Sequence, residues 1–137
     1  MTSCCDKKKA DQDATTPPSD LPPLRHDPQW EIHPFELRDA LAARHEIVLL
    51  DVRSPAEWEK AHLASAILTP LEEMPRRLDE LTVFKDKRVV VYCHHGRRSL
   101  QGVRMLRSAG FRMVHSLVGG IEAWSLYVDQ HIPRYER

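Results

Sequence analysis

The chain has 137 residues, a length that allows one domain with a well-formed core but not two ordinary domains. Its 20 Lys and Arg residues balance its 20 Asp and Glu residues, which excludes the basic excess that binding to nucleic acid or to an anionic membrane would use. Because only three cysteines are present and no apolar run is long enough for a membrane helix or a secretory signal, the sequence predicts a cytoplasmic protein with neither a disulfide framework nor a membrane span.

The N-terminal stretch is rich in Pro, Lys and Asp and holds almost no large apolar side chain before Leu21. Such a segment cannot bury enough surface to offset the entropy lost on ordering. We therefore expect a flexible tail over residues 1–25 and one folded domain over residues 26–137. The adjacent Cys4 and Cys5 are interpreted as exposed thiols of this tail; the alternatives are a redox pair, a metal-binding pair or a lipid attachment point.

Short apolar runs alternate with helical patterns along the expected domain. The sequence predicts strands near residues 30–32, 47–50, 66–68, 89–92 and 113–118, and helices near 34–41, 55–61, 71–81, 99–109 and 121–128. This alternation is typical of an α/β fold with a parallel sheet covered by helices on both faces. Ligands of such sheets bind at the carboxyl ends of the strands, where Asp51, Cys93 and Gly119-Gly120 fall.

Asp51 ends a buried strand and precedes a predicted helix start, in which Ser54 is the N-cap and Glu57 completes a capping box. We expect the Asp51 carboxylate to accept backbone amide hydrogens and so to support the loop rather than take part in chemistry. Arg53 and Glu57 lie four residues apart, and we expect them to form an ion pair worth roughly 0.3–0.5 kcal/mol if exposed.

Cys93 lies at the point where the apolar strand 89–92 ends in a short polar loop that leads into a helix. The first amide groups of a helix lack intrahelical partners and carry partial positive charge, so they would stabilise a thiolate. The alternative is an inert, buried cysteine. Gly96 favours a loop that turns its amides inward, and Arg97 and Arg98 add positive charge, so we interpret Cys93 as a nucleophile.

Four pieces of the chain resemble the single-domain rhodanese-like sulfurtransferases in order and spacing. These pieces are Asp51-Val52-Arg53-Ser54-Pro55-Ala56-Glu57-Trp58, His62-Leu63, Cys93-His94-His95-Gly96-Arg97-Arg98-Ser99 and Gly119-Gly120-Ile121-Glu122-Ala123-Trp124. The resemblance covers about residues 28–131 and departs from the family at Ala61, where a glycine is usual. It implies a rhodanese-like fold with a five-stranded parallel sheet, an active-site loop after Cys93, and a persulfide on that cysteine.

The implied reaction is a sulfur transfer. The Cys93 thiolate would attack the outer sulfur of a donor such as thiosulfate, sulfite would leave, and the persulfide would pass its sulfur to cyanide or a thiol. Backbone amides of residues 94–98 would surround the terminal sulfur. We expect no metal and no other cofactor. The expected partners are the small-molecule donor and acceptor, with a sulfur-relay protein as a further candidate and no nucleic acid.

The loop expected to bind substrate comprises His94, His95, Gly96, Arg97, Arg98 and Ser99. The planar guanidinium of Arg98 suits a sulfonate or sulfite group. Arg97 is either a second contact or a solvated side chain. His94 and His95 are interpreted as polar residues of the rim, with a role in holding a proton as the alternative.

Three other functions compete with sulfur transfer. One is a catalytically idle rhodanese module that binds a partner, although such a module does not need a thiol in an amide-lined loop. A second is redox chemistry in which Cys4 or Cys5 resolves a disulfide on Cys93. The third is a phosphatase, but phosphatases of this fold carry an arginine six residues after the cysteine, whereas Arg98 stands five after Cys93. The shorter loop suits one sulfur atom better than a phosphoryl group.

Overall fold

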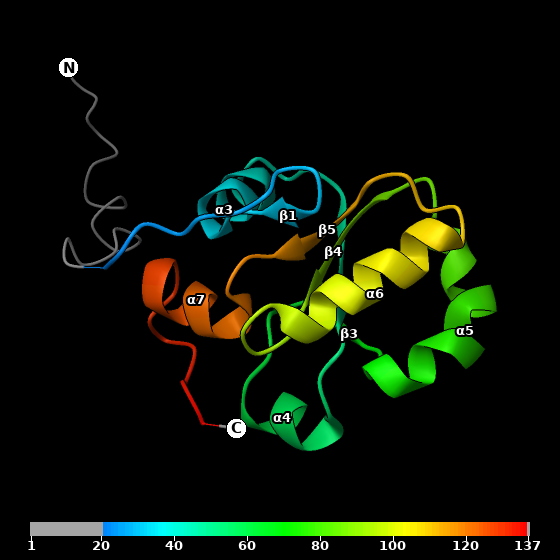
Figure 1. Cartoon of the computed structure of the whole chain (residues 1–137). Coiled ribbons are helices and arrows are strands. Elements are labelled where there is room, and N and C mark those ends of the chain that lie inside the picture. The colour runs from blue at the N-terminus through cyan, green and yellow to red at the C-terminus, as the bar shows by residue number, and fades with distance from the viewer. Residues whose placement is uncertain (1–20, 137) are drawn as a thin grey trace.

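The computed structural model describes residues 21–136 as five parallel strands flanked by helices (Figure 1). The strands are β1 (Glu31–Ile32), β2 (Ile47–Asp51), β3 (Ile67–Leu68), β4 (Arg88–Tyr92) and β5 (Val114–Leu117), in the sheet order β1-β5-β4-β2-β3. The predicted α/β fold with a five-stranded parallel sheet is confirmed. Cys4, Cys5 and most of the expected flexible tail lie outside the described residues.

The main helices are α3 (Pro34–Ala42), α4 (Pro55–Lys60), α5 (Met74–Leu81), α6 (Arg97–Ser108) and α7 (Gly120–Tyr127). One expected helix is divided: residues 71–81 begin as the 3₁₀ turn η1 (Leu71–Glu73) and continue as α5. Pro75 explains the break, because it has no amide hydrogen to donate to the carbonyl of Leu71. A second 3₁₀ turn, η2 (Thr82–Phe84), follows α5.

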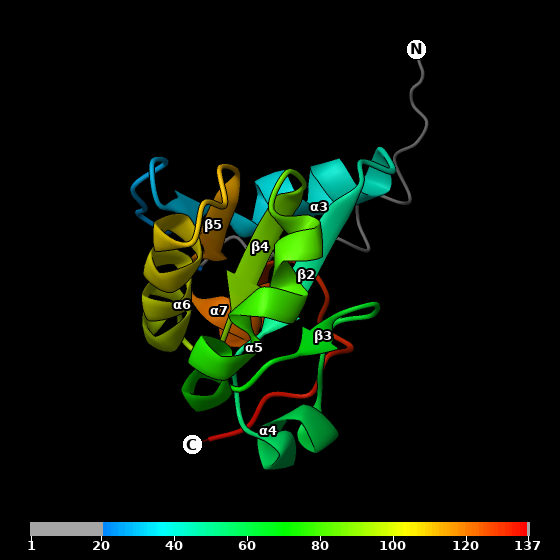
Figure 2. The ribbon, with the colours of Figure 1, turned by 90° about the vertical axis from the view of Figure 1, so that its right-hand side faces the viewer.

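The sheet separates two apolar cores, so helices cover both of its faces. In the central strand β4, Val90 and Tyr92 belong to the core that contains side chains of α3 and α7, whereas Val89 and Val91 belong to the core that contains side chains of α5 and α6. Figure 1 shows these two helix pairs on opposite sides of the sheet, and Figure 2 shows the same arrangement after a quarter turn. The continuous apolar run in β4 is explained by this two-sided burial.

The first described residues already contact the domain. Leu21 and Leu24 pack partly buried against the core on the α3 and α7 side, and the hydroxyl of Tyr127 donates a hydrogen bond to the carbonyl of Pro22. Within residues 21–136, no helix is both long enough and apolar enough to cross a membrane.

Strand register brings two loops together at one edge of the sheet. Asp51, the last residue of β2, is paired with Tyr92, the last residue of β4, and the amide of Val52 donates to the carbonyl of Tyr92 over 3.0 Å. Cys93 follows directly, so the loops after β2 and β4 are neighbours. Helix α4 and the C-terminal segment lie near this edge in both views (Figures 1 and 2).

Candidate active site around Cys93

The Cys93 thiol is the point on which the loop after β4 converges. Its Sγ accepts the backbone amide hydrogen of Gly96 over 3.0 Å and that of Ser99 over 3.4 Å, and only 1% of the residue is exposed. Gly96 adopts φ 101°, a left-handed conformation that turns the chain into α6, and a Cβ there would come within 3.2 Å of the Gly119 nitrogen. The sulfur therefore lies at a helix N-terminus, where partial positive charge stabilises a thiolate.

Two buried serines link the Cys93 thiol by hydrogen bonds to strand β5 in the core. The Cys93 thiol lies 3.5 Å from the hydroxyl of Ser99, which in turn lies 2.7 Å from the hydroxyl of Ser116 on β5. Both serines are fully buried. A protonated thiol donates to Ser99, whereas a thiolate accepts from it, and the Ser99–Ser116 hydrogen bond can reverse to suit either state because each hydroxyl both donates and accepts.

Backbone hydrogen bonds from the start of α7 hold the loop after Cys93 in position. The amide of Ile121 donates to the carbonyl of Cys93 over 2.8 Å, and the amide of Glu122 donates to that of His94 over 3.1 Å. Gly120 makes this approach possible, since a Cβ at its position would collide with both of these carbonyl oxygens. The Gly119-Gly120 turn thus fixes the shape of the cysteine loop.

Arg98 binds a carboxylate from the neighbouring loop. Its guanidinium donates two hydrogen bonds, of 2.9 and 3.0 Å, to the carboxylate of Glu57 on α4, and the Tyr135 hydroxyl donates a third, of 2.8 Å. Burial by itself raises the pKa of Glu57, but the hydrogen bonds from Arg98, Tyr135 and the Ser54 backbone outweigh burial and hold the pKa well below its usual range. Glu57 is therefore ionised at neutral pH and fixes the position of Arg98.

The expected Arg53–Glu57 ion pair is wrong. Arg53 is fully buried, and its Nε and terminal nitrogen donate to the two carboxylate oxygens of Asp51 over 2.8 and 2.6 Å. Asp51 also accepts the Arg53 amide over 3.0 Å, and the guanidinium reaches the Ala61 carbonyl and the Tyr135 hydroxyl. A buried cation needs several acceptors, and the carboxylate at the end of β2 supplies the closest ones.

The two histidines of the loop differ in their surroundings. His95 is exposed, but His94 is only 3% exposed, so the interpretation of His94 as a rim residue is wrong. The His94 ring stacks on the ring of His95 and on that of Tyr135, with centroids 4.0 and 4.2 Å away. Burial lowers the pKa of His94 and the neighbouring His95 adds to this, while Glu122, Glu57 and the Tyr135 backbone oppose it.

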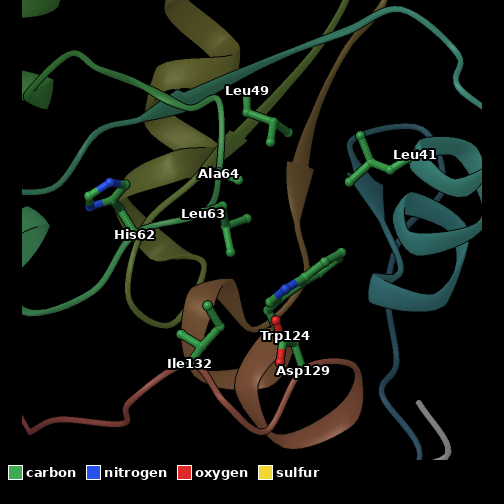
Figure 3. A pocket seen from close by; sticks show the side chains of 8 residues that line it. All are labelled: Leu41, Leu49, His62, Leu63, Ala64, Trp124, Asp129 and Ile132. Atoms are coloured by element: carbon green, nitrogen blue, oxygen red, sulfur yellow. The ribbon is translucent and has the colours of Figure 1, made fainter. Parts of the chain in front are cut away.

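A pocket of roughly 600 Å³ opens over the thiol and is lined by Cys93, His94, His95, Arg97 and Arg98. Arg97 is exposed and Arg98 is partly exposed, so positive charge borders the opening. A second hollow, of roughly 460 Å³, lies elsewhere, and Figure 3 shows Leu41, Leu49, Leu63 and Trp124 grouped around it. Its lining includes none of residues 93–99, so it is separate from the cysteine pocket.

Ser116 and Tyr135 belong to this arrangement although sequence reasoning did not identify them. A serine placed among mostly apolar residues near the end of strand β5 was the available signal for Ser116, because a buried hydroxyl needs a polar partner. Tyr135 gives no such signal. It follows the last helix by several residues, and only the folded chain places its hydroxyl between Arg53 and Glu57.

Comparison with known proteins is consistent with this geometry. The family model described as a rhodanese-like domain matches residues 34–127. A sulfurtransferase of Allochromatium vinosum is 37% identical over 95 residues, covering 69% of this chain and 87% of the relative. The thiosulfate sulfurtransferase GlpE of Coxiella burnetii is 36% identical over 90 residues, covering 64% and 79%.

Among solved structures, a thiosulfate sulfurtransferase of Pseudomonas aeruginosa superimposes with a TM-score of 0.67 at 30% identity, covering 78% of this chain and 20% of that one. The family match runs from α3 to α7 and so covers strands β2 to β5, the cysteine loop and the Gly119-Gly120 turn. The chain belongs to the rhodanese-like domain family, and sulfurtransferases are among its relatives.

Proposed function

We propose that this protein is a thiosulfate sulfurtransferase that carries sulfur as a persulfide on Cys93. The observation that carries the proposal is the convergence of two backbone amides, from Gly96 and Ser99, on one buried sulfur at the start of α6. An idle binding module has no use for donors aimed at a thiol. The sulfurtransferases among the relatives support the same reaction class.

In the first step, the Cys93 thiolate attacks the outer sulfur of thiosulfate. A sulfur–sulfur bond forms to Cys93, the sulfur–sulfur bond of thiosulfate breaks, and sulfite leaves with the electron pair. In the second step, cyanide or a thiolate attacks the outer sulfur of the persulfide, and the Cys93 thiolate is regenerated. Neither step needs an oxidant or a reductant, because in each step one nucleophile replaces another on the transferred sulfur atom.

The loop would act mainly by electrostatics. The negative charge of the persulfide lies on its outer sulfur, which would extend into the pocket from Sγ, and donors fixed before the reaction do not have to reorganise. Arg98, held by Glu57, borders the pocket and would bind the sulfonate end of thiosulfate together with the exposed Arg97. Asp51 would act indirectly, by fixing the neighbouring loop through Arg53.

The acceptor and the compartment follow from the same chemistry. A small nucleophile such as cyanide or a low-molecular-weight thiol can reach the pocket, and a sulfur-relay protein is a further candidate acceptor. Because Cys93 must return to the free thiolate after each turnover, we propose a reducing compartment, the cytoplasm.

The decisive experiment is the intact mass of the full chain after incubation with thiosulfate. We expect the mass to increase by one sulfur atom, and the addition of cyanide to remove that sulfur as thiocyanate. Cys93→Ser should fold, by far-UV circular dichroism, and should lose both events, because a serine hydroxyl is too weakly acidic to form the attacking anion. The variant in which Cys4 and Cys5 are both serine should retain them. Sulfur uptake that persists in Cys93→Ser would refute the proposal.

A further inference from the structure

Two stacked histidines and a carboxylate from another part of the chain meet beside the cysteine pocket. Ligand atoms of His94, His95 and Glu122 all lie within 4.8 Å of one another, and His94 Nε2 is 3.8 Å from Glu122 Oε1. The backbone explains the meeting, because the Glu122 amide is hydrogen-bonded to the His94 carbonyl and so places the start of α7 against the loop.

His94 is the unusual member of this group. Among the residues that the structure describes, neither of its ring nitrogens has a hydrogen-bond partner of normal geometry, although the side chain is 3% exposed. Buried polar atoms in proteins are nearly always paired, and an unpaired one often marks the place of an ion or water. Burial also favours the neutral imidazole, which is the form that binds metals.

The carboxylate of Glu122 is held in an orientation that suits a metal ligand. Its Oε2 accepts a 2.9 Å hydrogen bond from Nε of Arg134, while Oε1 is directed to the His94 side. Ligating carboxylates and imidazoles are usually held by such outer contacts. The ring of Tyr135 stacks on the His94 ring, with centroids 4.2 Å apart, and restrains the plane of that ring.

From this geometry we propose that His94, His95 and Glu122 bind a Zn²⁺ ion, and that the bound ion obstructs access to the cysteine pocket. Two imidazoles and one carboxylate are a ligand set that Zn²⁺ accepts, with the fourth position left open, whereas Mg²⁺ and Ca²⁺ prefer oxygen ligands. The two histidines also line the pocket of Cys93, so an ion between them stands at its wall.

The ligand atoms need a modest adjustment to hold the ion. Tetrahedral nitrogen and oxygen ligands about 2.0–2.1 Å from zinc lie about 3.3 Å apart. The ligand atoms here lie within 4.8 Å of one another, and His95 is exposed, so rotation of that side chain can bring its ring nitrogen closer without repacking the core. The sequence alone does not reveal this ligand set, because Glu122 lies far from the histidine pair along the chain.

The binding test uses the full chain with Cys4, Cys5 and Cys93 all replaced by serine, so that no thiol competes for the ion. Calorimetric titration with Zn²⁺ should give one ion per chain, and His95→Ala and Glu122→Gln should each weaken binding by at least about tenfold. The control His131→Ala removes an exposed histidine outside the group and should leave the affinity unchanged. Absence of binding, or binding that either of the two ligand variants leaves intact, would overturn the site.

The obstruction test uses the chain with Cys93 intact and only Cys4 and Cys5 replaced, and it rests on the proposed sulfur transfer. Zn²⁺ should slow persulfide formation from thiosulfate, and EDTA should reverse the effect. In the Glu122→Gln variant, the same concentration of Zn²⁺ should slow persulfide formation much less. Equal inhibition of both chains would overturn the obstruction. If the zinc-free chain takes up no sulfur at all, the proposed function fails, and the binding test still decides the site.

Discussion

The loops after β2 and β4 lie side by side, but they use their hydrogen-bond donors in opposite ways. After β2, the Asp51 carboxylate is fully buried and its charge is matched within the loop by the amide and guanidinium of Arg53. After β4, amides converge on a sulfur that faces a pocket of roughly 600 Å³. In the loop after β2, the donors are hydrogen-bonded to a buried carboxylate and stabilise the fold. In the loop after β4, the donors are directed at a sulfur atom beside a pocket, so they can stabilise charge on that sulfur during a reaction.

The largest expected effect comes from breaking the matched loop. Asp51→Asn removes the carboxylate and leaves the Arg53 charge buried, so we expect the free energy of unfolding to fall by about 3–5 kcal/mol. Urea denaturation measures this change. The matched control is Glu46→Gln, which removes the exposed partner of Lys87 and should cost at most about 1 kcal/mol. If the free energy of unfolding falls by similar amounts in the two variants, the buried Asp51–Arg53 pair contributes no more to stability than an exposed pair.

Glu57 joins the two loops, and its loss should show in the pH dependence of stability. The pKa of Glu57 is depressed by its partners, so its contribution is present above the unfolded-state pKa of about 4.3 and is lost as the pH falls below that value. Glu57→Gln should therefore lower the free energy of unfolding by about 1–3 kcal/mol at pH 7, and the difference from the parent chain should shrink toward pH 3. The exposed Glu80 provides the control variant Glu80→Gln. A difference that is constant with pH would contradict the assignment.

A variant of Arg98 tests whether the loop after β4 contributes to substrate binding or to the chemical step. If its guanidinium holds the sulfonate equally in the ground state and in the transition state, Arg98→Ala should raise KM for thiosulfate about tenfold, equivalent to about 1.4 kcal/mol, with little change in kcat. Arg97→Ala, which removes a neighbouring exposed charge, should have the smaller effect. A fall in kcat at constant KM would instead mean that Arg98 acts on the departing sulfite.

The smallest effect is expected for the serine pair. Ser116→Ala leaves the Ser99 hydroxyl without its buried partner, so the thiolate should be less well supported and persulfide formation should slow about threefold. Ser125→Ala is the matched control, since Ser125 is also buried but bonds the Ile132 carbonyl instead. Both variants should lose about 1 kcal/mol of stability, and only the first should change the rate. Equal rates in the two variants would remove Ser116 from the site.

The sequence by itself determined the parallel α/β fold and the position of Cys93 at the end of a strand. Both depend on local patterns: apolar runs of strand length, helical periodicity, and a glycine placed where the chain must turn into α6. The capping box of Ser54 and Glu57 is also local, and the structure confirms it.

Tertiary structure decided which charged side chains are partners. Glu57 lies four residues from Arg53 but accepts its paired hydrogen bonds from Arg98, and Tyr135 reaches the same carboxylate from the end of the chain. A sequence offers each charge several candidate partners, and burial selects among them, because a desolvated ion is stable only where the fold brings enough donors or acceptors to it. For the same physical reason, the meeting of His94 with Glu122 could be found only in the folded molecule.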